Sequence, residues 1–335
     1  MAMLNAANTF KLSSPAAAIA ALPALLGFTP ELSLVVLLIA SGELTGTLRV
    51  DLPGGRNMIG TLAYSAATCG ADSAIVIVVD ADGAPCDMCR DEHRELIAEL
   101  RTELERRDIE LLGAHIVDRV EAGGRWHCWD GCGADGVIDD PKASPLTMQA
   151  VLTGRVMHNS RQEIAALFET SDPARTAHLA DLLAGPPHDL EEADIAAELT
   201  AALAILTAFT ETMSLSDSDA ARLAMALTDA RIRDSLIGLA AGATARQALE
   251  LWTRLAQLLP GTHRADALTM AAVTSYILGD NPRASIAVDV ALRIKPDHRL
   301  AAMIDVALTN GLPSEHVRRL GDTGRTIARR YGIEL

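Results

Sequence analysis

Aromatic residues are scarce in this sequence: Phe, Trp and Tyr together make up only 3% of its 335 residues. Hydrophobic residues nevertheless account for 49% of the chain. The cores must therefore be built from Ala, Leu, Ile and Val, which favours closely packed helices. A chain of this length is more typical of two domains than of one, and each domain would be large enough for its own core.

Basic residues are also in short supply, because 29 Lys and Arg face 44 Asp and Glu, giving a formal net charge of −15. A charge of this sign argues against a general binder of nucleic acid or of anionic membranes. A local basic patch escapes that argument, and the tail from His316 to Arg330 carries one. It could bind nucleic acid or an acidic partner, or it could form a solvated helix face. Its arginines are Arg318, Arg319, Arg325, Arg329 and Arg330.

Long uninterrupted apolar runs are missing as well. The most apolar stretch, 15–40, is broken by Pro23, Gly27 and Pro30 before it reaches the roughly 20 residues that a bilayer requires. Lys11 alone precedes it, whereas a secretory signal has a basic segment there. Five cysteines, an odd number, fit a reducing compartment. We therefore expect a cytoplasmic protein that does not enter a membrane.

The first 143 residues alternate between strand and helix patterns. Ser13 and Ser14 can cap a helix with Pro15 in its first turn. The run 34–39 has no polar face, so as a strand it must be covered on both sides. The remaining elements expected here are strands at 44–50, 74–79, 109–120 and 125–129, and helices at 56–69 and 91–107. This order predicts an α/β domain over 1–143, a mixed sheet with flanking helices.

From residue 144 onward the pattern is helical throughout. We expect helices at 145–157, 160–169, 172–184, 189–213, 217–240, 244–258, 263–278, 281–294 and 298–310. A second, all-α domain over 144–335 follows, with a possible hinge at 185–188, where Gly185 is followed by two prolines.

One helical pair, 263–296, carries a sharper pattern. Its segment Tyr276–Asp280, together with Ala284, Ala291 and Pro296, resembles the tetratricopeptide repeat in spacing. One full repeat is visible, whereas about three normally make an independent solenoid. The resemblance implies a helical domain whose concave face holds a protein partner.

Two acidic residues, Asp80 and Asp82, directly follow the strand at 74–79, where open α/β sheets bind ligands. The pattern is similar to the first motif of haloacid-dehalogenase-type phosphatases. It departs from that motif at Ala84, where Thr or Val is expected. No lysine lies between it and the acidic pair at 139–140, although those enzymes require one. An ordinary acidic turn is the other interpretation.

Four of the cysteines fall in two short motifs, one with Cys86 and Cys89 and the other with Cys128 and Cys132. Together they suggest a four-thiolate zinc site, with His93 and His127 as spare ligands. Topology argues against a shared site. The strands at 74–79 and 109–120 should be parallel and the hairpin strand 125–129 antiparallel, which would put Cys128 at the opposite end of the sheet from Cys86. No metal or other cofactor is therefore expected. Cys86 and Cys89 are either a redox pair or incidental thiols.

Trp126 and His127 could form the wall of a pocket, or they could simply cover the edge of the sheet. In the helical domain, Arg233 lies four residues after Asp229 and beside Asp234, a spacing at which charges pair along a helix. An arginine held by acids could bind an anionic ligand, or the group could be a structural ion pair.

Three segments together resemble a bacterial family called domain of unknown function four-one-nine-two. They are the opening at 14–36, the stretch from Trp126 through Pro141 to Gly154, and 215–234. The resemblance supports the architecture and the cytoplasmic location, and it implies no mechanism. Cys128 and Cys132 fall inside the family pattern, whereas Cys86 and Cys89 lie outside it.

The sequence thus favours a non-catalytic protein that acts as an interaction, scaffold or regulatory protein, because it shows no complete catalytic constellation. The alternative is an enzyme or a small-ligand binder in the α/β domain. Such a site would lie near Asp80 and Asp82, or near Trp126, and would take a ligand that contains phosphate or a nucleotide.

Overall fold

The computed structural model describes residues 14–152, 157–185, 191–312 and 314–335, and the chain separates into two compact units. We call 1–161 with 309–311 the N-terminal unit, and 162–308 with 312–335 the helical unit. The division falls after residue 161, whereas the sequence pattern changes at 144, because α5 (Pro145–Leu152) belongs to the N-terminal unit.

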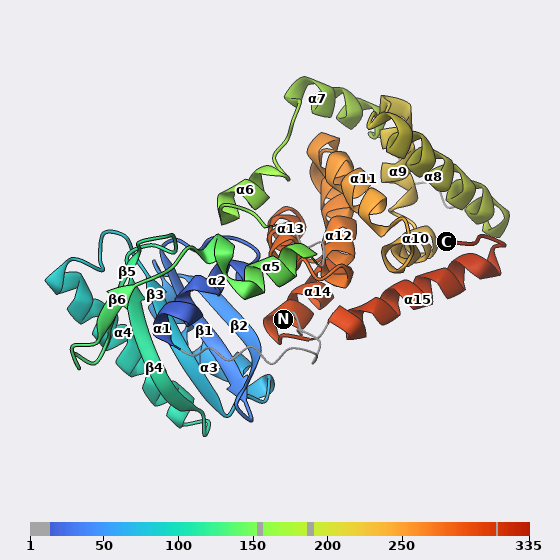
Figure 1. The fold of residues 1–335 in the computed structure, drawn as a ribbon. Helices are drawn as coiled ribbons and strands as arrows, with labels where there is room; N and C mark the ends of the chain where they lie inside the picture. Colours follow the sequence, from blue (N-terminus) through green and yellow to red (C-terminus); the bar gives the residue numbers. More distant parts are fainter. Residues whose placement is uncertain (1–13, 153–156, 186–190, 313) are drawn as a thin grey trace. The chain divides into compact units, whose positions relative to one another are not determined.

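The N-terminal unit is built on one six-stranded sheet in the order β2-β1-β3-β4-β5-β6 (Figure 1). Only β3 and β4 are parallel, and every other neighbouring pair is antiparallel, which confirms the mixed sheet. The strands are β1 (Ser33–Ala40), β2 (Glu43–Asp51), β3 (Ser73–Val79), β4 (Glu110–Val117), β5 (Arg125–Cys128) and β6 (Asp135–Val137). The short strand β6 is absent from the sequence-based expectation because three residues are too few to show a period.

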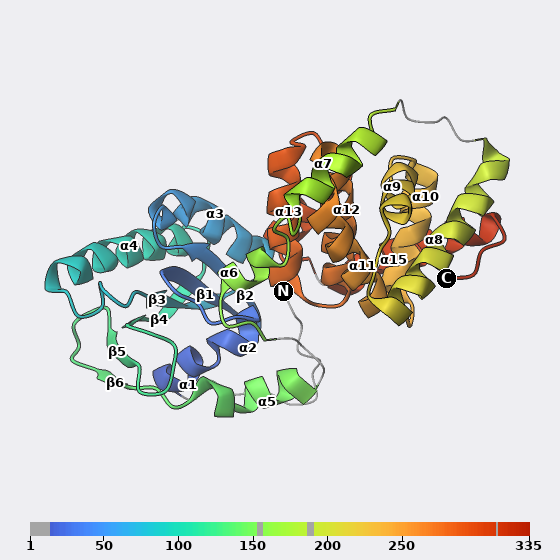
Figure 2. The same ribbon diagram turned by 90° about the horizontal axis from the view of Figure 1, so that it is seen from above.

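Helices cover both faces of this sheet, as the apolar run in β1 requires. Leu34 and Val36 pack with Ile59 of α3 (Gly55–Thr68) and Leu100 of α4 (Asp87–Glu105) in one core. Figure 2 shows α3 and α4 on one side of the sheet. It shows α1 (Pro15–Ala20), α2 (Leu22–Leu26) and α5 on the other. The expected cap of α1 is present, since the Ser14 hydroxyl accepts the N–H of Ala17. A short 3-10 helix, η1 (Pro141–Ala143), precedes α5.

The described part of the helical unit contains helices and connecting segments. These are α6 (Arg161–Ala166), α7 (Pro173–Leu182), α8 (Glu192–Thr212), α9 (Asp217–Ala226), α10 (Ala230–Leu236), η2 (Ile237–Ala241), α11 (Ala245–Leu258), α12 (Gly261–Ile277), α13 (Asn281–Ile294), α14 (Arg299–Thr309) and α15 (Ser314–Arg330). The helix α12 is the core of the unit, because every residue from Ala265 to Ile277 is buried.

One expected helix, 217–240, is wrong as a single element. The chain breaks after α9, and Asp229 caps a new helix by accepting the N–H of Arg231. The expected pair at 263–278 and 281–294 is present as α12 and α13, joined by a turn in which Gly279 has φ +81°. Its assignment to the tetratricopeptide class stays a prediction. The possible hinge at 185–188 lies, except for Gly185, outside the described residues.

The last helix, α15, approaches its neighbours too closely for side chains at the contact. A Cβ atom on Gly324 would lie 2.5 Å from the carbonyl oxygen of Asp234 and 2.6 Å from the nitrogen of Gly238. A Cβ atom on Gly321 would lie 2.7 Å from that of Ala241. These glycines therefore let α15 dock directly on α10 and η2.

Candidate functional site

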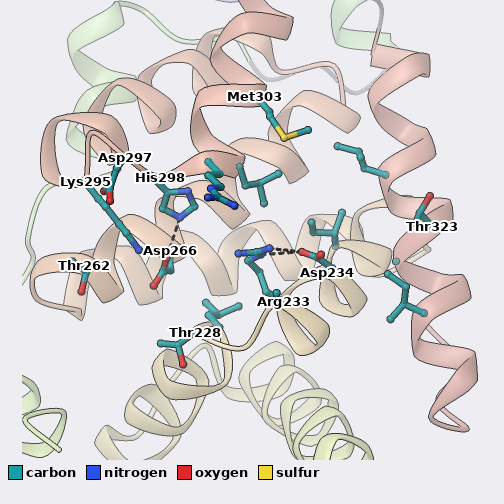
Figure 3. Close-up of a pocket in the computed structure, with 18 residues that line it drawn as sticks. Thr228, Arg233, Asp234, Thr262, Asp266, Lys295, Asp297, His298, Met303 and Thr323 are labelled. Atoms are coloured by element: carbon teal, nitrogen blue, oxygen red, sulfur yellow. Dashed lines mark hydrogen bonds and ion pairs between the residues drawn. The ribbon is translucent and has the colours of Figure 1, made fainter. Parts of the chain in front are cut away.

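A cavity of about 640 Å³ lies in the helical unit, between α10, the first half of α12, the α13–α14 connection and α15 (Figure 3). This volume is within the range of about 300–1,000 Å³ that is usual for ligand sites. Its lining combines charged and apolar side chains. The charged residues are Arg233, Asp234, Asp266, Lys295, Asp297, His298 and Arg299, and the large apolar ones are Leu227, Ile237, Leu300, Met303, Leu320 and Ile327.

The charged part of the lining is anchored by a buried pair, Asp266 on α12 and His298 before α14, which are 7% and 3% exposed. His298 Nδ1 accepts the N–H of Ala301, so the ring proton is on Nε2, which donates to Asp266 Oδ1 over 2.9 Å. Lys295 Nζ lies 4.0 Å from the same oxygen. This arrangement keeps Lys295 at the cavity and balances the charge of Asp266.

Arg233, for which the sequence offered Asp229 and Asp234 as acidic neighbours, lines this cavity and pairs with Asp234. Asp229 lies at the start of α10, where it bonds to Arg231, and that guanidinium holds the pKa of Asp229 below its usual range. Arg233 instead donates from Nε and Nη2 to Asp234 Oδ1, over 2.9 and 2.8 Å. In Figure 3 its side chain lies between Asp234 and the pair of Asp266 and His298. The expected pairing of Arg233 with Asp229 is wrong because Asp229 precedes the helix as its cap.

Arg299 supplies a further cation at the cavity, and it forms no ion pair within the described residues. It is the first residue of α14, and Met303, one turn later, also lines the cavity while remaining 60% exposed. The site can therefore receive a group that is both anionic and apolar. Sequence reasoning missed Lys295, His298 and Arg299. Their only signal is the run 295–299, four polar residues and a proline at the junction of two helices, which is the usual composition of a loop.

Asp80 follows β3, as expected, but its carboxylate is already engaged. Its Oδ1 accepts the N–H groups of Asp82 and Gly83 over 3.2 and 2.9 Å, and its Oδ2 lies 3.1 Å from Nε2 of the buried His93. Asp82 itself is exposed. Since a nucleophile must present an oxygen to its substrate, this geometry makes Asp80 a residue that fixes the loop.

Replacing Asp80 with alanine should lower the free energy of unfolding of the N-terminal unit by about 1–3 kcal/mol, because two N–H groups and the buried His93 lose their partner. Asp82→Ala is the matched control, two residues away and exposed, and should leave stability unchanged. Urea denaturation of both variants measures the difference. Equal stability of the two would contradict a structural role for Asp80.

Trp126 and His127 point to opposite faces of β5, so they do not form one pocket wall. Trp126 is buried and contacts His115 edge to face, with ring centroids 5.3 Å apart. His127 lies on the face of α4, where burial, followed by the charges of Arg90 and Arg94, lowers the pKa of its imidazole. His127 is therefore neutral at physiological pH, near two arginines.

The four motif cysteines do not converge within the described side chains. Cys86 caps α4 by accepting the N–H of Cys89, and its hydrogen bond raises the pKa of the Cys89 thiol to about 11. The strand directions are as expected, but β5 is only four residues long. Cys128 consequently pairs with His115 in the second half of β4, rather than lying at the far end of the sheet.

A smaller group does converge: Cys128, Asp130 and Cys132 bring one possible ligand atom each to within 4.8 Å of one another. Burial, followed by hydrogen bonding with Cys132 and Asp130, raises the pKa of the Cys128 thiol to about 11. The raised pKa keeps Cys89 and Cys128 protonated at neutral pH, which disfavours a nucleophilic role for either thiol.

These features define a protein with a mixed α/β unit and a helical unit that contains a cavity of mixed polarity. The chain belongs to the family described as Domain of unknown function (DUF4192), whose model matches residues 15–315. Comparison with curated proteins and with solved structures returned no match. In the part of the chain that the structure describes, no helix has both the length and the apolar character needed to cross a bilayer.

Proposed function

We propose that this chain is a non-catalytic interaction protein of the cytoplasm, and that its helical unit holds a partner protein through the cavity described above. The observation that carries the proposal is that Arg299, a cation that forms no ion pair within the described residues, lies beside the apolar side chains of Leu300 and Met303 at one opening. The partner segment would place an acidic side chain near Lys295 and Arg299 and an apolar side chain against Leu300 and Met303.

The charge of the chain supports an acidic partner at this place. The protein carries a net charge of −15, whereas the lining of the cavity balances three cations, Arg233, Lys295 and Arg299, against three carboxylates, and Arg299 forms no ion pair within the described residues. An ion pair formed in a partly enclosed cavity is screened less than one on an open surface. Complementary charge of this kind selects the partner and accelerates its binding.

The surface around the cavity favours a protein, rather than a small molecule, as the ligand that binds there. Met303 and Val306 of α14 are 60% and 58% exposed, so apolar surface extends along the helix beyond the cavity. Exposed apolar surface with a polar border is typical of protein interfaces. The resemblance of the pair α12 and α13 to a tetratricopeptide repeat points the same way.

A photoreactive amino acid in place of Met303 tests this function in the cells that make the protein. It should form a crosslink to one discrete protein, because position 303 lies at the contact. Met213 is the matched control, since it is 62% exposed and is not among the residues of the cavity. The same crosslinked products from both positions, or none from position 303, would contradict the proposal.

A further inference from the structure

The hairpin loop between β5 and β6 gathers two thiols and a carboxylate, independently of the cavity. Ligand atoms of Cys128, Asp130 and Cys132 all lie within 4.8 Å of one another. The loop is closed by the N–H of Cys128, which donates to the carbonyl of Ala134 over 2.8 Å. Asp130 Oδ1 accepts the N–H of Cys132 over 3.0 Å, which fixes the carboxylate between the two thiols.

The backbone of this loop makes the convergence possible. Gly131 and Gly133 have φ of +74° and +84°, a conformation that residues with a Cβ atom rarely adopt. Two left-handed residues within five positions turn the chain back on itself, so Cys128 and Cys132 face a common centre. With Zn–S bonds of about 2.3 Å, atoms bound to one tetrahedral ion lie about 3.8 Å apart. Small side-chain rotations would therefore bring these atoms to bonding positions.

A second observation comes from the neighbouring strand. His115 is the cross-strand partner of Cys128, so the two side chains project from the same face of the sheet. Its side chain is nine-tenths buried, and Nδ1 has no hydrogen-bond partner among the described residues. A buried imidazole nitrogen without a partner is costly, and coordination of a metal or a hydrogen bond to a metal-bound water would satisfy it.

We propose that Cys128, Asp130 and Cys132 bind a zinc ion at this loop, beside His115. Two thiolates, a carboxylate and a nearby imidazole are the donor types that zinc takes in proteins. Calcium and magnesium prefer sites made entirely of oxygen ligands, so this group of two thiols and one carboxylate does not suit them. The ion would tie the β5–β6 hairpin to the edge of the sheet, which the short strands hold only weakly.

Titration with Co²⁺ tests the site, because tetrahedral thiolate coordination gives cobalt a charge-transfer absorption and intense visible bands. The full chain is reduced, treated with a chelator and titrated, and Zn²⁺ should then displace the cobalt. Cys128→Ser and Cys132→Ser should each lower affinity by more than the about 10–100-fold typical for loss of an outer-shell partner. Asp130→Asn should lower it as well.

The double variant of Cys86→Ser with Cys89→Ser is the matched control, since it removes a two-thiol motif outside the group and should bind cobalt unchanged. Circular dichroism shows whether each variant is folded. The proposal would be overturned if cobalt gave no thiolate band, if binding survived Cys128→Ser combined with Cys132→Ser, or if the control lost binding equally. A disulfide between Cys128 and Cys132 in protein purified without oxidant would overturn it too.

Discussion

Gly324→Ala should destabilise the helical unit by about 3 kcal/mol, although alanine is the better helix former. The added Cβ would lie 2.5 Å from the carbonyl oxygen of Asp234 and 2.6 Å from the nitrogen of Gly238. Both are backbone atoms, so no side-chain rotation relieves the contact. The helix α15 must move as a whole, which separates it from α10 and η2. The urea dependence of hydrogen exchange in peptides of α12 measures the loss.

Gly60→Ala is the control that separates packing from helix propensity. Gly60 is an exposed residue inside α3, and a Cβ atom there meets nothing within 4 Å. This variant should stabilise its own unit by roughly 0.5–1 kcal/mol. If Gly324→Ala were equally stabilising, the close docking of α15 would be wrong. Because Leu320 and Ile327 of α15 line the cavity, Gly324→Ala should also weaken partner binding.

Asp266→Ala should lower the free energy of unfolding of the helical unit by about 1–3 kcal/mol, the range found when a buried hydrogen-bonding group loses its partner. His298, only 3% exposed, would lose the acceptor of its Nε2 proton, and Lys295 would lose its nearest carboxylate. The effect should reach α14, because His298 Nδ1 also accepts the N–H of Ala301 in the first turn of that helix. Urea denaturation gives the size of the effect, and exchange in peptides of α14 gives its location.

Asp266→Asn distinguishes the hydrogen bond from the charge. The amide oxygen of asparagine can still accept the proton of His298, so this variant should be much more stable than Asp266→Ala. It also removes a negative charge from the wall of the cavity. If both variants were equally unstable, the hydrogen bond would not be the main contribution of Asp266.

The sequence predicts the N-terminal unit well because its signals are local. The apolar run of β1 requires cover on both faces, and Ser14 and Pro15 mark the start of α1. The turn that joins β1 to β2 is equally local, and its Ser41 and Gly42 both have positive φ. Each of these features depends on residues within a few positions of one another, which is the range over which sequence patterns carry information.

The sequence predicts the helical unit less completely, because its helix break and its cavity depend on side-chain contacts. Apolar residues recur at helical spacing from 217 to 240, but the side chain of Asp229 accepts the N–H of Arg231 and starts a new helix, which no periodicity reveals. The cavity is assembled from Arg233, Asp266, Lys295 and Ile327, which lie up to about ninety positions apart. Arg233 alone was a candidate from sequence, with two possible acidic partners, because which of them it pairs with depends on where the helix begins.

The two candidate sites of the N-terminal unit also depend on contacts that the sequence does not reveal. Asp80 has the sequence position of a catalytic residue, but His93, thirteen residues later, occupies one of its oxygens. The pairing of Cys128 with His115 follows from the register of the β4–β5 hairpin, which keeps Cys128 within three residues of the end of β4. The directions of the strands alone do not reveal this register.

The most direct test of the central claim is the yield of the crosslink from position 303 when the charge of the cavity is changed in both directions. Arg299→Glu reverses an exposed cation at the first position of α14, where an acidic residue suits the helix dipole, so the fold should be unaffected. We expect the yield to fall at least tenfold in Arg299→Glu and to rise or stay unchanged in Asp266→Asn. Equal yields in wild type and Arg299→Glu would show that the cavity does not bind its partner through charge.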